Sequence, residues 1–246
     1  MITGIAAAYR RVRHSLARIS FLRSGYYLLR SIAEALHDSS SRGQAELNRE
    51  FAAREDPWSY ATASCQVDRI RREMEMLDAV RHHERFQNAL EVGCAEGIST
   101  ENLALLCKRL LAVDISPVAL DRARRRLEGS THVHFAHWDL RSEQLPETYD
   151  LIVTVHALEY VRNPLQIRRI RQKLVNGLRP GGYLLIGTMK VADIFEDSWW
   201  GPFLLRSGKT INNFFAAHPA LQVITTEKLN LGTQYTAYEI LLQKKL

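Results

Sequence analysis

Cysteine is scarce in this sequence, and long apolar runs are absent from it. Only three cysteines occur among 246 residues, and none of them forms a C-x-x-C pair. So low and odd a count argues against a disulfide framework and favours a reducing compartment. The sequence contains no run of about 18 apolar residues, which argues against a membrane-spanning helix. These absences together predict a cytoplasmic protein.

The positive charge of the chain is spread unevenly. The formal net charge is +6, but residues 1–36 hold six arginines against the single acid Glu34. Much of the excess charge is therefore local to the N-terminus, and it gives little reason to expect nucleic-acid binding by the rest of the chain. We expect no nucleic-acid partner. The hydrophobic fraction of 46% and the length suit one α/β domain with an added segment.

Apolar residues recur at steps of three and four through the first segment, which predicts an amphipathic helix with basic sides. They are Ile5, Tyr9, Val12, Leu16, Ile19, Leu22, Tyr26, Leu29, Ile32 and Leu36. Small polar residues at 38–43 predict a linker. The expected organisation is a basic helix and linker over 1–43 and one domain over 44–246. Residues 1–36 have four open roles: packing on this domain, self-association, peripheral contact with a membrane surface, or a transit peptide.

Helical and strand patterns alternate from residue 86 onward, which predicts a doubly wound α/β sheet. A further helix is expected around residues 67–80, after a turn at Asp56-Pro57-Trp58. The last two strands lack a clear helix between them, so an antiparallel hairpin is expected at the sheet edge. The predicted strands are 87–92, 109–114, 132–138, 149–155, 182–188, 221–227 and 234–242, and the helices lie near 97–107, 117–127, 163–177 and 208–217.

The segment Ala89–Gly97 indicates a buried strand, a tight glycine turn and the start of a helix. The next strand ends in Asp114, which lies 21 residues after Gly93. A βαβ unit of this kind places bare backbone, a helix N-terminus and a ribose-binding acid together at the carboxyl edge of a parallel sheet. The sequence therefore predicts a site for an adenosine-containing cofactor.

The composition of the turn argues against a dinucleotide. The three positions of a G-x-G-x-x-G pattern hold Gly93, Ala95 and Ile98, so two of its glycines are missing. Glu96 and Glu91 add acidic groups where a pyrophosphate would need positive charge. These features favour a ligand that is cationic here. S-adenosylmethionine (SAM) carries an ammonium and a sulfonium, and it fits this expectation.

The pattern E-x-G-x-x-x-G, followed by Asp114, resembles motifs I and II of class I SAM-dependent methyltransferases. Three later segments resemble further pieces of this family in the right order: 133–139, which ends in an acid, the motif IV strand 149–156, and the L-x-P-G-G turn and strand 178–186. The resemblance implies a Rossmann-like seven-stranded sheet and SAM as cofactor. The cofactor-binding residues it implies are Glu91, Gly93, Cys94, Ala95, Gly97, Asp114, Ile115, Asp139, Leu140 and Val155.

Residues 46–161 resemble the NodS group of these enzymes, through 55–60, 88–94, 103–107 and 110–124. The resemblance implies N-methylation of the deacetylated sugar amine of a chitooligosaccharide. In one departure, this chain has Val155-His156 where the group has a Ser-Glu pair. A histidine suits deprotonation of a hydroxyl, because its ordinary pKa lies near neutrality. The acceptor expected is therefore a hydroxyl or an amine of a small or sugar-like molecule.

His156 is the first choice for a catalytic base, because it ends the fourth strand where the sheet meets ligands. The alternative is a histidine that only lines the cofactor or packs in the core. Glu159 and Tyr160 are second choices, and Tyr60 is expected to close over the cofactor or acceptor. Residues 199–203 include two tryptophans and a phenylalanine, which suit either ring stacking on an acceptor or a packed lid. Methyl transfer requires no metal, and none is expected.

Three functions compete at this point. The first is a methyltransferase of a small molecule or glycan. The second is an RNA or protein methyltransferase guided by the arginine-rich arm, against which the motif IV segment lacks an N/D-P-P-Y sequence. The third is a non-catalytic scaffold, which would have no need of Gly93, Asp114 and Asp139.

Overall fold

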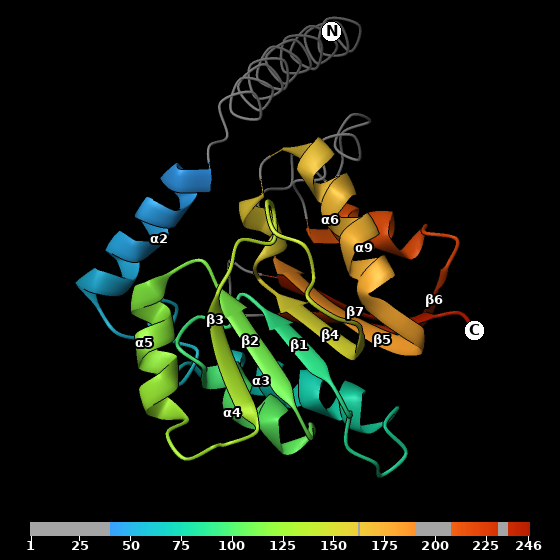
Figure 1. The fold of residues 1–246 in the computed structure, drawn as a ribbon, viewed down its shortest axis with the longest axis horizontal. Coiled ribbons are helices and arrows are strands. Elements are labelled where there is room, and N and C mark those ends of the chain that lie inside the picture. Colours follow the sequence, from blue (N-terminus) through green and yellow to red (C-terminus); the bar gives the residue numbers. More distant parts are fainter. Residues whose placement is uncertain (1–39, 162, 190–207, 231–235) are drawn as a thin grey trace, which may run out of the picture. The chain divides into compact units, whose positions relative to one another are not determined.

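A seven-stranded sheet forms the centre of the computed structural model, which describes residues 40–161, 163–189, 208–230 and 236–246 (Figure 1). The strand order is β3-β2-β1-β4-β5-β7-β6. The strands are β1 (Ala89–Val92), β2 (Leu110–Asp114), β3 (Val133–His137), β4 (Tyr149–Val155), β5 (Leu178–Met189), β6 (Leu221–Asn230) and β7 (Thr236–Lys244).

The first five strands are parallel, and β7 runs antiparallel between β5 and β6. The predicted alternation and the antiparallel hairpin at the edge are both confirmed. Strand β1 pairs with β2 on one side and with β4 on the other. The order in which the chain adds strands therefore reverses between β1 and β4. Ligands bind at such a reversal in open α/β sheets, outside the carboxyl ends of the strands.

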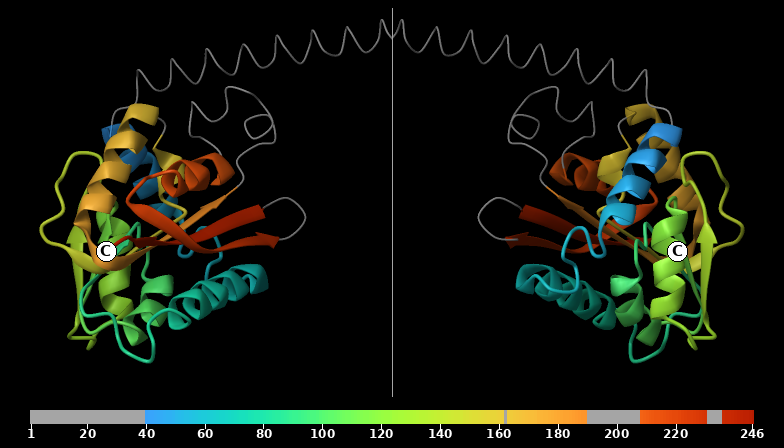
Figure 2. Two further views of the ribbon diagram at one scale, coloured as in Figure 1. Left: turned by 90° about the vertical axis from the view of Figure 1, so that its right-hand side faces the viewer. Right: turned by 90° about the vertical axis from the view of Figure 1, so that its left-hand side faces the viewer.

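Helices cover both faces of the sheet (Figure 2). On β4, Ile152 packs in a cluster with Ile170 of α6 and Phe215 of α9. The adjacent Leu151 faces the other way and packs with Leu77 of α3. The described helices are α2 (Ser40–Ala53), α3 (Ser64–Asp78), α4 (Ile98–Leu105), α5 (Pro117–Arg126), α6 (Pro164–Gly177) and α9 (Gly208–Ala216), with a short 3₁₀ helix η1 (Leu158–Tyr160).

Helices α5 and α6 begin with the same kind of N-cap. Ser116 accepts a hydrogen bond from the backbone of Ala119 at the start of α5, and Asn163 accepts one from Leu165 at the start of α6. A proline follows each cap, where its missing N–H costs nothing. These sequence signals are local, and they explain why both helix starts agree with the predictions.

Two segments differ from the expectations. Helix α2 begins at Ser40 and so includes part of the predicted linker 38–43. Serine favours helix starts as well as loops, and this explains the difference. Strand β5 begins at Leu178 and includes the predicted L-x-P-G-G turn, with a shift of register opposite Tyr149 and Leu151. The division at residue 43 stays a prediction.

Two predicted features lie outside the described residues. They are the basic helix within 1–36 and the aromatic group at 199–203. Within the described ranges, no helix is both long enough and apolar enough to cross a bilayer.

Candidate active site

The turn between β1 and α4 has three residues with left-handed backbone. Gly93, Ala95 and Gly97 have φ angles of 81°, 47° and 82°. Glycine adopts this conformation without steric cost. A Cβ on Gly93 would lie 2.7 Å from the Cβ of Ala157, so any side chain there would displace the loop after β4. The turn therefore presents bare backbone at the reversal point of the sheet.

Cys94 in this turn points into the protein. Its side chain is buried in a small cluster with Ala112 and Leu120. Burial raises the pKa of the Cys94 thiol well above its ordinary value, so the thiol stays neutral and unreactive. Only the backbone of Cys94 is therefore placed to contribute to a ligand site.

Asp114 ties the end of β2 to this turn. One carboxylate oxygen accepts a hydrogen bond from the backbone of Ala95 at 2.9 Å, and the other accepts one from Ser116 at 2.8 Å. Burial raises the pKa of Asp114, while these backbone donors act in the opposite direction. The neighbouring Ile115 is held through its carbonyl, which accepts a hydrogen bond from Gln44 of α2 at 2.8 Å. The predicted ribose-binding acid thus lies beside the turn, as the motif spacing implies.

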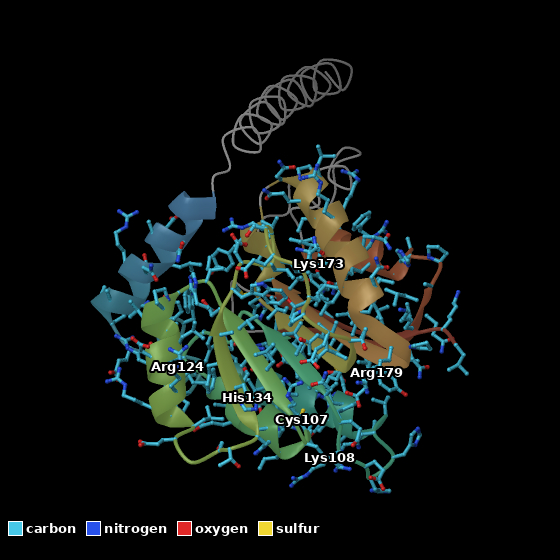
Figure 3. All side chains as sticks on the ribbon, in the orientation of Figure 1. Cys107, Lys108, Arg124, His134, Lys173 and Arg179 are labelled. Atoms are coloured by element: carbon cyan, nitrogen blue, oxygen red, sulfur yellow. The ribbon has the colours of Figure 1, made fainter. Side chains whose placement is uncertain are left out.

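Asp139 lies two residues beyond β3, and its carboxylate is already engaged. The side chain of Arg141 donates to Asp139 at 2.9 Å, so an adenine amino group would share this carboxylate with an arginine. Leu140 is buried in the sheet cluster, and Lys173 of α6 donates to its carbonyl at 2.5 Å. Figure 3 shows Lys173 among the side chains above the sheet.

Glu91 is a buried acid directly before the glycine turn. Its carboxylate accepts a hydrogen bond from the hydroxyl of Thr100 at 2.7 Å. Burial raises the pKa of Glu91 to about 7, and the nearby charges of Glu73 and Asp114 act in the same direction. Glu91 is therefore poised to ionise near neutral pH, and a cation beside it would favour its charged form.

The raised pKa of Glu91 gives a testable effect on stability. An acid that holds its proton more tightly in the folded state makes stability fall as pH rises, here from about 4.5 to about 7. Glu91→Gln removes this titration. We expect the variant to gain up to about 3 kcal/mol over wild type across this range, measured by urea unfolding at each pH.

Glu84→Gln is the matched control, because Glu84 is exposed. Its free energy of unfolding should track that of wild type at every pH. A difference between Glu91→Gln and wild type that stays constant from pH 4.5 to pH 7 would show that Glu91 ionises with an ordinary pKa.

The expected role of Glu96 as a negative charge facing the ligand is wrong. Its carboxylate forms an ion pair with Arg122 of α5 and accepts a hydrogen bond from the backbone of Asp56 at 2.7 Å. The side chain is 4% exposed, so this charge is neutralised within the protein. Glu96 instead fastens the Asp56-Pro57 turn to the cofactor turn. Glu91 and Asp114 are the acids left to favour a cationic ligand there.

His156 occupies a strained position directly after β4. Its φ is 53°, which is uncommon for a residue with a side chain and is often found at functional sites. Its backbone N–H donates to the carbonyl of Gly187 on β5 at 2.8 Å. The imidazole is buried, with 3% of the side chain exposed. The neighbouring strand therefore holds His156 at the carboxyl edge of the sheet.

The two nitrogens of His156 have different surroundings. Nδ1 lies 3.1 Å from a carboxylate oxygen of Glu159, and this oxygen also accepts a hydrogen bond from the backbone of Met189 at 2.9 Å. An ionised carboxylate only accepts, so the Nδ1 proton points to Glu159 and Nε2 of the neutral ring carries a lone pair. Nε2 is buried and has no hydrogen-bond partner among the described residues. This arrangement suits a proton acceptor.

Tyr60 lies in the segment between α2 and α3, close enough to Glu159 and Tyr160 for them to act on the pKa of its phenol. Its backbone N–H donates to Asp56 at 2.6 Å, and its ring stacks on Trp58 with centroids 5.9 Å apart. The guanidinium of Arg69 lies 5.3 Å from the centre of the Tyr60 ring. Burial raises the pKa of the Tyr60 phenol, so its hydroxyl remains a donor. Tyr160, in contrast, is 46% exposed.

Three buried charged residues near this edge were not predicted. Arg69 and Glu73 form an ion pair within α3, and Glu239 lies on β7. The helical spacing of apolar residues predicted α3. The neighbouring sequence does not show that Arg69 and Glu73 form a buried ion pair rather than a solvent-exposed one. Among the described residues, no group of three or more metal-binding side chains occurs.

Most of the chain matches a known protein family. The family described as Nodulation protein S (NodS) matches residues 39–232. The chain belongs to the NodS family. Nodulation protein S of Sinorhizobium fredii is 34% identical over 167 residues, which cover 65% of this chain and 76% of that protein. Nodulation protein S of Rhizobium tropici is 37% identical over 147 residues, which cover 60% of each chain.

A solved NodS structure agrees with this assignment. The N-methyltransferase NodS from Bradyrhizobium japonicum WM9, in complex with S-adenosyl-L-homocysteine, has a TM-score of 0.69 and 27% identity to this chain. The match covers 82% of this chain and 98% of the solved one. The protein is therefore a class I SAM-dependent methyltransferase, and SAM is its cofactor. The bare turn at Gly93 and the buried acids Glu91 and Asp114 fit this cationic nucleoside.

Proposed function

We propose that the protein methylates an amine or a hydroxyl of a small, sugar-like molecule and that His156 accepts the proton of this group. The observation that carries the proposal is the buried Nε2 of His156, which has no hydrogen-bond partner in the described part of the chain, opposite an Nδ1 that Glu159 orients. SAM, when bound, supplies a methyl group activated by its sulfonium. The acceptor atom must offer a lone pair, so a base that holds its proton contributes directly to the rate.

Glu159 is assigned as a positioning residue for His156. Its carboxylate bridges the imidazole and the backbone of Met189, which fixes the ring with Nε2 as the acceptor. Tyr160 follows on the same 3₁₀ turn and is exposed, so its hydroxyl is available to orient an acceptor. This division of roles gives each of the three candidate catalytic residues a distinct task.

The cofactor site is assigned to the turn and the strand ends around it. The backbone of Gly93, Cys94, Ala95 and Gly97 would receive the amino-acid part of SAM, and Glu91 would favour its positive charge. Asp114 would accept hydrogen bonds from the ribose. The remaining assignments follow the order of the strand ends: Asp139 for the adenine, Ile115, Leu140 and Val155 as lining, and Tyr60 as a cover.

Transfer of labelled methyl groups tests the proposed acceptor class. We would incubate the protein with labelled SAM and three acceptors: a chitooligosaccharide with a free amine, its fully N-acetylated form, and total RNA. Label should enter one or both oligosaccharides. Label that enters only RNA would favour the alternative of an RNA methyltransferase guided by the arginine-rich residues 1–36.

A further inference from the structure

Glu239 on β7 is a buried acid with no hydrogen-bond partner in the part of the chain that the structure describes. The residue is 1% exposed, and neither carboxylate oxygen has a hydrogen-bond partner among the described residues. Burial of a carboxylate without a partner is costly in free energy. A residue that persists in this state needs a reason other than stability.

The position of Glu239 links it to the candidate active site. Glu239 lies opposite Gly187 of β5 in the sheet. A Cβ on Gly187 would lie 2.2 Å from Oε2 of Glu239 and 2.8 Å from Cγ1 of Val155. These two atoms are therefore at most about 5 Å apart. Figure 1 shows β4, β5 and β7 side by side. The carboxylate thus lies over Gly187 of β5, close to Val155, the residue that precedes His156.

The absence of a side chain at Gly187 makes room for this carboxylate. The carbonyl of the same Gly187 accepts the backbone hydrogen bond from His156. One glycine therefore both positions the proposed base and leaves space for the acid. A Cβ at position 187 would occupy the space that the carboxylate of Glu239 fills.

The surroundings of Glu239 contain more acid than base. Of the described groups with the largest electrostatic effect on Glu239, three are the acids Glu73, Glu159 and Glu227, and one is the base Arg69. Arg69 already pairs with Glu73 and donates to Gln66 at 2.8 Å. Burial, followed by the charge of Glu73, raises the pKa of Glu239 well above its ordinary value. Glu239 therefore tends to keep its proton, and a cation beside it would favour its charged form.

We propose that Glu239 binds a positively charged ammonium group of the acceptor beside the position served by His156. The inference rests on the proposed function and assigns the residue that recognises an amine on its acceptor. Glu239 would then be a specificity-determining residue, because a neutral acetamide could not supply the missing charge.

Binding of two disaccharides tests this role without catalysis. The protein loaded with S-adenosylhomocysteine is titrated by calorimetry with chitobiose, which has free amines, and with N,N′-diacetylchitobiose, which has none. We expect wild type to bind chitobiose at least about tenfold more tightly. Glu239→Gln should abolish this preference and leave the affinity for S-adenosylhomocysteine unchanged.

Two further variants make the test specific. Glu227→Gln is the matched control, since Glu227 lies opposite Glu239 on β6, is partly exposed and pairs with Arg72 at 3.1 Å. This variant should keep the preference for chitobiose. Gly187→Ala should lose it, because the new Cβ would displace the carboxylate of Glu239. Should Glu239→Gln fail to fold, Gly187→Ala supplies the readout.

The inference is overturned if wild type shows no preference for chitobiose, or if a folded Glu239→Gln retains it. A different outcome would overturn the proposed function. If neither disaccharide nor oligosaccharide gains label from SAM, the methyl acceptor is misassigned even where amine binding depends on Glu239. If the acetylated form gains label and no amine preference exists, only the role of Glu239 is lost.

Discussion

Replacement of His156 by alanine should lower kcat by about 10²- to 10⁴-fold, the range by which a positioned base accelerates proton transfer. The dissociation constant for SAM should stay close to that of wild type, since the imidazole faces the acceptor rather than the cofactor in this proposal. Initial rates at saturating SAM and acceptor give kcat, and calorimetry gives the affinity for SAM. The contrast between the two quantities is the decisive measurement.

His134→Asn is the matched control for His156→Ala. His134 is an exposed residue of β3, away from the β4 edge (Figure 3), and its replacement should change neither quantity. Glu159→Gln should give a smaller loss of kcat, because the ring remains but its Nδ1 partner no longer fixes the tautomer. Equal losses of turnover and SAM affinity in His156→Ala would assign the histidine to cofactor lining instead.

Replacement of Asp114 by alanine should weaken SAM binding by at least about a hundredfold. The proposed ribose contacts are two hydrogen bonds to a charged acceptor, and each contributes about 1.5–3 kcal/mol. The same change removes the anchors that hold the backbone of Ala95 and Ser116. Calorimetric titration with SAM measures the effect, and thermal unfolding of the variant shows whether the turn or the whole fold has been affected.

Asp121→Asn provides the comparison for Asp114→Ala. Asp121 is an exposed residue of α5 that pairs with Arg124 at 3.0 Å, so its loss should leave SAM affinity unchanged. An Asp114→Ala variant that binds SAM as tightly as wild type would mean that the ribose lies elsewhere.

The elements of the sheet were predictable because their signals are local. Strand β2 is a short apolar run that ends in Asp114, and α5 begins at once with Ser116 and Pro117. Such patterns depend on residues a few positions apart, and they keep their meaning in any tertiary context. The start of α2 was harder to predict, because serines like those near residue 40 are typical of a loop as well as of a helix start.

The charges of the site were only partly predictable. The sequence shows Glu96 in the turn, but not that Arg122 neutralises it from a helix further along the chain. The same holds for Glu239, whose neighbours Val155 and Gly187 are distant in sequence and adjacent only through the order of β4, β5 and β7. Whether an acid faces a ligand or a partner depends on contacts of this kind.

The sequence by itself determined the order of strands and helices, the cofactor class and the residues at the strand ends, because each follows from patterns within about 25 residues. Only the tertiary structure decided that Glu96 is paired and that Glu91 is poised to ionise near neutral pH. It also decided that Glu239 is buried next to Gly187, with no hydrogen-bond partner among the residues that the structure describes. The physical reason is that burial and electrostatic partnership are set by the packing of strands and helices far apart in the chain.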